Sequence, residues 1–307
     1  MKNNFIIAAI LALLLLVFPA IAANMHIFAI LSYDAAPYEA VLKGFEDYLA
    51  RNKIEPPLKI LRLSGNAARL VQVVPELKKD GNVLILALGS LATQETSRQA
   101  PDVPVVAGMI LTPRDLAGKE NATGVSLEFP IEVQFNWLKR ILPESTNIGV
   151  IYNPAENGLR IETATRLANG MGLRLDSQAV HSPRDIPVVL ENLAKRVTAI
   201  WGVSDKMVLT PQTAEEILLF SYQNRIPFIG LSSSWVKAGA LYSLEWDYFD
   251  MGVQCAEMVQ KVMQGTKIGS IPVAFPRKVF YCINLKTAKA MRIEIAKEVI
   301  DGAREVY

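Results

Sequence analysis

The sequence is poor in the side chains that build disulfide scaffolds and metal sites. Its 307 residues include only two cysteines, Cys255 and Cys282, and two histidines, His26 and His181. Two cysteines are too few for a disulfide-rich scaffold. The histidines have no cysteine or carboxylate at ligand spacing, so they form no metal-binding pattern. We therefore expect neither a metal nor any other cofactor.

Common catalytic and nucleotide-binding motifs are also missing. No G-x-S-x-G nucleophile elbow and no Walker A loop occur. Gly170-Met171-Gly172 precedes a strand-like run instead of following one, so we interpret it as a helix end and not as a dinucleotide fingerprint. The formal net charge of +2 gives no indication of the clustered basic face that binds nucleic acid. The sequence thus indicates neither an enzyme nor a nucleic-acid-binding protein.

One long apolar run is present, at the N-terminus. Residues 5–18 are apolar without interruption, Lys2 precedes them, and Pro19 is followed by the small-x-small sequence Ala20-Ile21-Ala22. This pattern is typical of a secretory signal peptide. The alternative is an uncleaved anchor, but the run is shorter than the ~20 residues that span a bilayer. We expect a signal peptide over residues 1–22, cleavage near Ala22, a periplasmic location and no stable membrane insertion afterwards.

The rest of the chain alternates short apolar runs with segments of helical period. Strand-like runs occur at residues 26–31, 58–63, 83–88, 103–107, 148–152, 173–175, 199–203, 227–231, 240–244 and 273–282. Most are separated by helical segments, and a long helix is expected over 248–264. Alternating strands and helices predict βαβ units with parallel sheets. The fold class is therefore α/β, with two doubly wound parallel-sheet lobes joined by a hinge.

Candidate binding residues follow from this fold class, because open parallel sheets bind ligands beyond the carboxyl ends of their strands. The residues at those ends are Ser32, Tyr33, Asp34, Tyr38, Gly89, Ser90, Leu91, Ala92, Thr93, Thr112 and Ser126 in the first half, and Tyr152, Asn153, Glu156, Asn157, Asp205, Ser232, Ser233 and Glu245 in the second.

Some of these residues suggest a ligand chemistry. The run from Gly89 to Thr93 opens a helix, where free N–H groups favour an anion such as a carboxylate. Asp205 and Glu156 are acceptors for an ammonium group, and tyrosines supply flat apolar walls. Together they suit a zwitterion such as an amino acid. The alternative is that such residues simply populate strand-to-helix loops.

Several segments resemble a known family when they are taken in order. They are residues 86–94, 121–126, 151–154, 156–157, 226–228, 239–240, 247–248, 252, 265, 283–284 and 288. In these segments the chain resembles ABC transporter substrate-binding proteins of the tryptophan/tyrosine/phenylalanine-binding type, which have a type I periplasmic binding protein fold.

The resemblance implies two lobes with a ligand between them. Lobe 1 would span residues 25–123 with 240–266 returning to it, and lobe 2 would span 124–239 with 267–307. On this layout Cys255 and Cys282 fall in different lobes, where a disulfide would lock the hinge, so free thiols are expected.

The chain departs from the family pattern at three places. Thr112-Pro113 stands where relatives tend to have Asp-Pro, Glu245-Trp246 replaces a region with an expected glycine, and residues 292–296 lack the usual Gly-Ile-x-Ile-Pro element. The first two places lie near the expected cleft, so ligands other than an aromatic amino acid stay open.

The expected function is capture of a small molecule, an amino acid or a related carboxylate, for an ABC permease in the inner membrane. One alternative is a ligand-sensing receptor for a membrane sensor kinase. A second alternative is an exported enzyme on the same scaffold, but the sequence contains no recognisable set of catalytic residues for it.

Overall fold

The computed structural model describes residues 25–79 and 81–307, and its contacts divide the chain into two compact units. Unit 1 contains the described residues up to Glu128 together with Asp247–Arg277. Unit 2 contains Phe129–Trp246 and Lys278–Tyr307. The chain therefore passes between the units three times. The predicted signal peptide, residues 1–22, lies outside the described residues.

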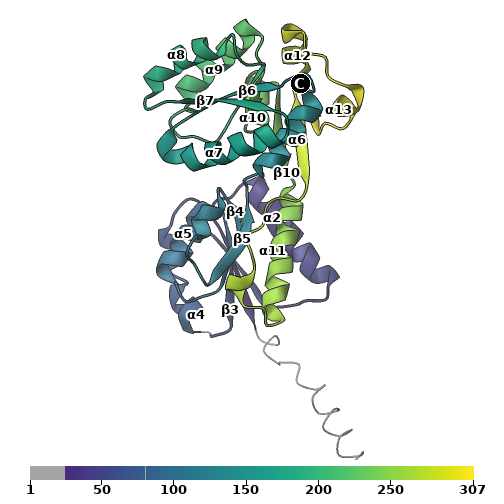
Figure 1. Cartoon of the computed structure of the whole chain (residues 1–307). Helices are drawn as coiled ribbons and strands as arrows, with labels where there is room; N and C mark the ends of the chain where they lie inside the picture. Colours follow the sequence, from purple (N-terminus) through teal and green to yellow (C-terminus); the bar gives the residue numbers. More distant parts are fainter. Residues whose placement is uncertain (1–24, 80) are drawn as a thin grey trace, which may run out of the picture. The chain divides into compact units, whose positions relative to one another are not determined.

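Unit 1 is built on a parallel sheet of five strands in the order β2-β1-β3-β4-β5 (Figure 1). The strands are β1 (His26–Leu31), β2 (Leu58–Arg62), β3 (Val83–Leu88), β4 (Val105–Ile110) and β5 (Ala122–Ser126). Every residue of β3 and β4 is buried. Both strands are covered on two faces, which explains why their sequences are continuous apolar runs instead of alternating ones.

The helices of unit 1 lie on both faces of this sheet (Figure 1). They are α2 (Ala36–Arg51), α3 (Ala68–Val71), α4 (Val74–Lys79), α5 (Ser90–Gln99), the 3-10 turns η2 (Pro113–Leu116) and η4 (Ile268–Ser270), and the returning helix α11 (Tyr248–Met263). Helices α2 and α11 run side by side at very short range. A Cβ atom at Gly44 would lie 1.9 Å from the carbonyl oxygen of Phe249, and one at Gly252 would lie 1.9 Å from that of Val41. Only glycine permits this approach of two helix backbones.

Unit 2 contains a sheet of seven strands in the order β12-β11-β10-β9-β8-β6-β7. The strands are β6 (Asn147–Tyr152), β7 (Arg174–Ala179), β8 (Ala199–Trp201), β9 (Phe228–Gly230), β10 (Tyr242–Trp246), β11 (Val279–Ile283) and β12 (Glu305–Val306). Only the β10–β11 pair is antiparallel among these pairings. The helices are α6 (Ile131–Ile141), α7 (Pro154–Gly170), α8 (Ile186–Leu193), α9 (Pro211–Asn224), α10 (Ser233–Ala238), α12 (Leu285–Met291), α13 (Lys297–Asp301) and the 3-10 turn η3 (Pro183–Asp185).

Each passage between the units lies later than the expected positions near residues 123, 240 and 266, and the third differs most. Strand pairing explains the first two differences. Strand β5 pairs with β4 and so keeps residues 122–126 in unit 1, whereas β10 pairs with β9 and β11 and so keeps residues 242–246 in unit 2. The third differs because Ala274 forms a bridge with Val125 of β5, which holds that stretch in unit 1.

Both cysteines are buried and free, and they lie in different units. Cys255 belongs to α11 and Cys282 to β11. Burial raises the pKa of the Cys255 thiol to about 12. Among the helices of the described residues, none is long and apolar enough to cross a membrane.

Candidate functional site

The carboxyl ends of the parallel strands of unit 1 share one edge of the sheet, and Ser32 ties two of these ends together. Ser32 follows β1 and is fully buried. Its hydroxyl donates to the carbonyl oxygen of Leu88 at 2.7 Å and accepts from the N–H of Ala92 at 2.9 Å. Both functions of the hydroxyl are used within the protein. We conclude that Ser32 holds the start of α5 against the ends of β1 and β3 and positions this edge.

The first turn of α5 offers unpartnered N–H groups. Gly89 precedes the helix with a φ of +89°, a left-handed conformation that favours glycine. The N–H of Ala92 is bound by Ser32 and that of Thr93 by the carbonyl oxygen of Gly89 at 3.1 Å. The N–H groups of Ser90 and Leu91 have no partner in the part of the chain that the structure describes. Two donors at a helix N-terminus therefore remain for an anion.

Two tyrosines stand beside this turn. The rings of Tyr33 and Tyr38 meet edge to face with centroids 6.0 Å apart, and Tyr33 is 50% exposed. A Cβ atom at Gly89 would lie 2.8 Å from the hydroxyl oxygen of Tyr38, so a larger residue at 89 would displace that ring. Burial, and then the neighbouring Tyr33, raise the pKa of Tyr38, which keeps its hydroxyl protonated. Tyr38 thus lies against the turn that carries the free N–H groups, and Tyr33 packs edge to face against Tyr38.

The remaining predicted residues of unit 1 are occupied by the protein's own turns. Asp34 accepts from the hydroxyl of Ser64, and its Oδ1 lies 3.5 Å from Nε of Arg62. Thr112 caps η2 by accepting from the N–H of Arg114 at 3.0 Å. Ser126 is fully buried and accepts from the N–H of Glu128 at 3.3 Å. Their acceptors are less available to a ligand than sequence reasoning indicated.

In unit 2, Asp205 is the centre of a hydrogen-bond network and is only 3% exposed. Its Oδ2 accepts from the backbone N–H of Asn153 at 2.7 Å and from Nδ2 of Asn157 at 2.9 Å. Its Oδ1 accepts from the N–H groups of Met207 and Val208, each at 3.0 Å. Four bonds fill the usual capacity of a carboxylate. This geometry gives Asp205 a positioning role and argues against the predicted contact with a ligand ammonium.

The loop after β6 depends on that network. The side chain of Asn153 caps α7 by accepting from the N–H of Ala155 at 3.0 Å, and Nδ2 of Asn157 also donates to the carbonyl oxygen of Ser204 at 3.0 Å. Glu156 is exposed and accepts from the N–H of Lys206 at 3.1 Å. Tyr152 packs against the core of unit 2. The structure thus brings together the predicted residues that follow β6 and β8, as members of one hydrogen-bond network.

Glu245 lies at the carboxyl end of β10, beside the start of α10. Its carboxylate accepts from the hydroxyl of Ser243 at 2.9 Å and from the backbone N–H of Ser233. Burial raises the pKa of Glu245, and these two bonds and Arg304 oppose the shift. The hydroxyl of Ser232 has no partner among the described residues. Sequence reasoning missed Ser243, although two residues spaced by two on a strand share a face.

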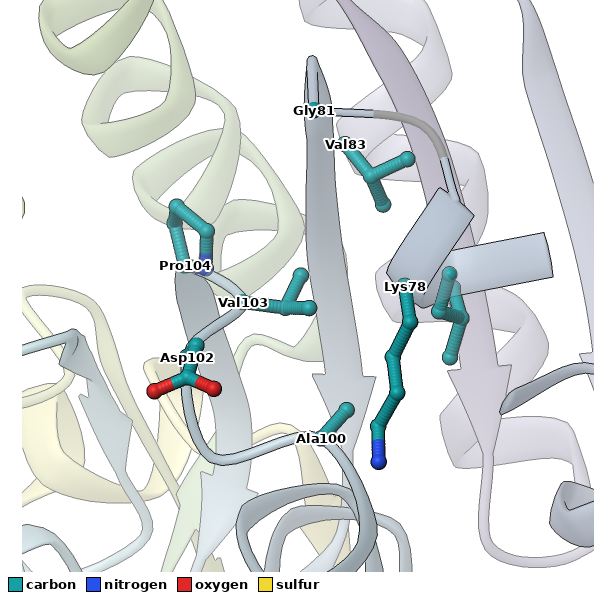
Figure 2. A pocket seen from close by; sticks show the side chains of 8 residues that line it. Lys78, Gly81, Val83, Ala100, Asp102, Val103 and Pro104 are labelled. Carbon is teal, nitrogen blue, oxygen red and sulfur yellow. The ribbon is translucent and has the colours of Figure 1, made fainter. Parts of the chain in front are cut away.

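One cavity of unit 1 lies away from these residues. A pocket of about 330 Å³ is lined by Leu77, Lys78, Gly81, Val83, Ala100, Asp102, Val103 and Pro104 (Figure 2). Val83 begins β3 and Pro104 precedes β4, so this pocket lies at the amino ends of the strands. None of the predicted site residues lines it. Within residues 25–79 and 81–307, no group of three His, Cys, Asp or Glu side chains is arranged to hold a metal ion.

The chain is similar in sequence to a known family and to individual proteins. Residues 24–307 match the family described as ABC transporter substrate binding protein. The tyrosine-binding protein of Clostridioides difficile is 22% identical over 228 residues, which cover 71% of this chain and 64% of the relative. The chain thus matches less than two thirds of that relative's length. An uncharacterized protein of Rickettsia prowazekii is 22% identical over 249 residues, which cover 80% of this chain and 78% of that protein.

Solved structures share the fold. A Streptococcus pneumoniae ABC domain in complex with L-Trp is 24% identical, with a TM-score of 0.60, covering 92% of this chain and 100% of that one. A ligand-free, open substrate-binding protein with adhesive properties from Clostridium difficile is 17% identical, with a TM-score of 0.74, covering 92% and 99%. The fold is that of type I periplasmic binding proteins, as the sequence predicted. The chain belongs to the ABC transporter substrate-binding protein family.

Proposed function

We propose that this chain is an exported, periplasmic protein that captures an amino acid, or a related carboxylate, and delivers it to an ABC permease in the inner membrane. The family match supports binding and delivery of a solute without chemistry on it. The relative named tyrosine-binding protein and the structure with L-Trp support an amino acid as the ligand class. The apolar run of residues 5–18 supports export.

The observation that carries the ligand class is the start of α5. The N–H groups of Ser90 and Leu91 are without partners in the described chain, and the Tyr33–Tyr38 pair stands beside them. A ligand carboxylate would accept from both N–H groups, at about 1.5–3 kcal/mol for each charge-assisted bond. An apolar ligand side chain would pack against this tyrosine pair.

A ligand ammonium needs an acceptor, and unit 2 carries predicted acidic residues at the carboxyl ends of its strands. Asp205 is saturated by four bonds from its own loops, which leaves Glu156 and Glu245 as the predicted acidic residues at this edge. Glu245 accepts two bonds, is partly buried, and lies beside the start of α10, which Ser232 precedes. A carboxylate in such surroundings gains more from a cationic partner than an exposed one does, so we assign the ammonium contact to Glu245.

Thermal stability of the purified mature protein tests this function. L-tyrosine and L-tryptophan are compared with their counterparts that lack the ammonium group and with a hexose. A ligand at 100 times its Kd adds about 2.7 kcal/mol of apparent stability. Stabilisation by the amino acids and not by the deaminated acids is expected. Stabilisation by the hexose, with no response to any amino acid or carboxylate, would refute the proposed ligand class.

A matched pair of variants tests whether the Tyr33–Tyr38 pair contacts the ligand. Tyr33→Ala removes a tyrosine that is 50% exposed at the predicted edge, and Tyr222→Ala removes one that is 60% exposed on α9 of unit 2. Tyr33→Ala should weaken amino-acid binding by at least about fivefold, because an aromatic contact is worth roughly 1 kcal/mol beyond its buried area. Tyr222→Ala should leave it unchanged.

A further inference from the structure

The third passage of the chain between the units is preceded by a segment that forms no strand of its own. Residues 271–277 run from η4 to the end of unit 1, and one β-bridge joins them to β5. The N–H of Ala274 donates to the carbonyl oxygen of Gly124 at 2.8 Å, and the N–H of Ser126 donates to that of Ala274 at 3.0 Å. The hydroxyl of Thr123 adds a bond to the carbonyl oxygen of Ile271 at 2.8 Å. The third passage is thus tied to the first, which follows Glu128.

Arg277, the last residue of unit 1, ties the same segment to α11. Its Nε lies 2.8 Å from Oδ2 of Asp250, and its Nη2 lies 3.2 Å from Oδ1. Its Nη1 lies 3.0 Å from both carboxylate oxygens of Glu257. One turn away, Nε2 of Gln254 donates to the carbonyl oxygen of Phe275 at 3.0 Å. Positions 250, 254 and 257 share one side of the helix, so a row of three side chains holds the segment.

The position of Asp250 in the chain determines which segments the Arg277–Asp250 ion pair connects. Asp250 lies in the first turn of α11, and its N–H is bound by the side chain of Asp247, at which the second passage enters unit 1. The Arg277–Asp250 pair therefore connects the ends of the second and third passages. With the bridge at Ala274, all three passages are fastened together on the unit 1 side.

The pair is stronger than an ordinary surface ion pair. Exposed pairs contribute about 0–1 kcal/mol. The side chain of Asp250, however, is only 6% exposed, and it lies at a helix N-terminus, where negative charge is favoured. Arg277 binds it with two parallel N–H donors, which is the strong geometry for a guanidinium and a carboxylate. Glu257 adds a second carboxylate, so the arginine is fixed from two sides.

We propose that Arg277 is a positioning residue of the hinge. By fixing the third passage to the start of α11, it confines rotation between the units to the peptide bonds after Glu128, before Asp247 and after Arg277. The residue touches no predicted ligand contact, and it acts through the range of arrangements that the two units adopt. Its importance for uptake rests on the proposed function, but the physical claim concerns the ligand-free protein.

The test compares Arg277→Met with a matched control, Arg196→Met. Arg196 of unit 2 is exposed to a similar degree, 48% against 43%, and pairs with the partly buried Asp176 away from any passage between the units. Spin labels on Lys43→Cys and Glu191→Cys place one exposed probe in each unit. Both native cysteines are buried and stay unlabelled. The distribution of label distances is measured without ligand by double electron–electron resonance.

Arg277→Met should broaden the distance distribution, whereas Arg196→Met should not. Amide hydrogen exchange over residues 271–277 should rise at least about tenfold in Arg277→Met, as expected from the loss of a bond between charged groups, while the amides of β1 and β3 stay protected. Unchanged distances together with unchanged exchange would overturn the proposal, and so would equal broadening in both variants.

Arg277→Lys keeps a positive charge near Asp250 but lacks the two parallel N–H donors of the guanidinium. It should give an intermediate exchange rate over 271–277. If Arg277→Met does not fold, this variant decides the question, because exchange equal to the wild type would overturn the proposal. A wild type that binds no amino acid would refute the proposed function alone, since neither readout involves a ligand.

Discussion

Replacing Asp205 by Asn should destabilise unit 2 strongly, although the two side chains have almost the same shape. In the wild type, each carboxylate oxygen accepts two hydrogen bonds, and the side chain is buried. An Asn side chain can keep its oxygen toward the N–H groups of Met207 and Val208. Its NH2 group would then face two other donors, the N–H of Asn153 and Nδ2 of Asn157.

The magnitude follows from the number of bonds lost. Two charge-assisted bonds disappear, and one buried backbone N–H is left facing another donor. A bond to a charged group contributes about 1.5–3 kcal/mol, and an unsatisfied buried group costs about 1–3 kcal/mol. Because some relaxation is expected, we predict a loss of about 3 kcal/mol in the free energy of unfolding of unit 2. Glu156→Gln is the control, since Glu156 is exposed and accepts a single hydrogen bond, from the N–H of Lys206. This substitution should lower the free energy of unfolding by less than about 0.5 kcal/mol.

Urea unfolding followed by tryptophan fluorescence isolates the response of unit 2. All four tryptophans, Trp137, Trp201, Trp235 and Trp246, lie in that unit. Asp205→Asn should lower the urea midpoint with an unchanged slope. A variant that keeps wild-type stability but loses amino-acid binding would refute the positioning role and restore Asp205 as a direct ligand contact.

Three further predictions concern packing, pH and thiol reactivity. Gly252→Ala should cost unit 1 about 3 kcal/mol or more, because the new Cβ would lie 1.9 Å from the carbonyl oxygen of Val41; unchanged urea unfolding by circular dichroism would contradict this. Burial raises the pKa of Glu245 above its ordinary 4.5, so the folded protein holds this proton more tightly than the unfolded chain does, and stability is lost as the pH rises from 4.5 through the raised pKa. Glu245→Gln should therefore melt higher than the wild type near neutral pH and lose that advantage below pH 4.5; parallel melting curves across this range would show the assignment to be wrong. Burial raises the pKa of Cys255 to about 12 and that of Cys282 to about 11, so a thiol reagent should modify neither residue quickly until denaturant is added; fast reaction of one thiol in the native protein would be inconsistent with the structure.

The sequence predicts the central strands best. The runs at 26–31 and 83–88 have the predicted bounds, because each is an uninterrupted apolar segment. Thr210 caps α9 as its position before Pro211 indicates. Pro75 lies in the first turn of α4, just after the break that separates α4 from α3.

Strands with little apolar sequence are harder to predict. Strand β5, Ala-Thr-Gly-Val-Ser, has few large side chains, and it is buried only because β4 and residues 271–274 flank it. The run at 273–282 is a strand only from Val279, since Pro276 and the contacts of Arg277 hold its first part in unit 1. Pairing partners distant in the sequence decide both cases.

The candidate site shows the same limit. Sequence alone finds the loops, because the carboxyl ends of parallel strands lie at one edge of a sheet. It cannot say which acceptors are already used. The donors that occupy Asp205 come partly from Asn153 and Asn157, about 50 residues away in the chain, and the donor and acceptor roles of Ser32 both depend on β3 and α5.

Hydrogen exchange with and without L-tyrosine or L-tryptophan is the most direct test of where this protein binds its ligand. We predict that ligand slows exchange at residues 89–92 in unit 1 and at residues 232–234 in unit 2, while the amino-end pocket around Lys78 and Asp102 is unaffected. Protection confined to that pocket would contradict ligand binding at the carboxyl ends of the strands.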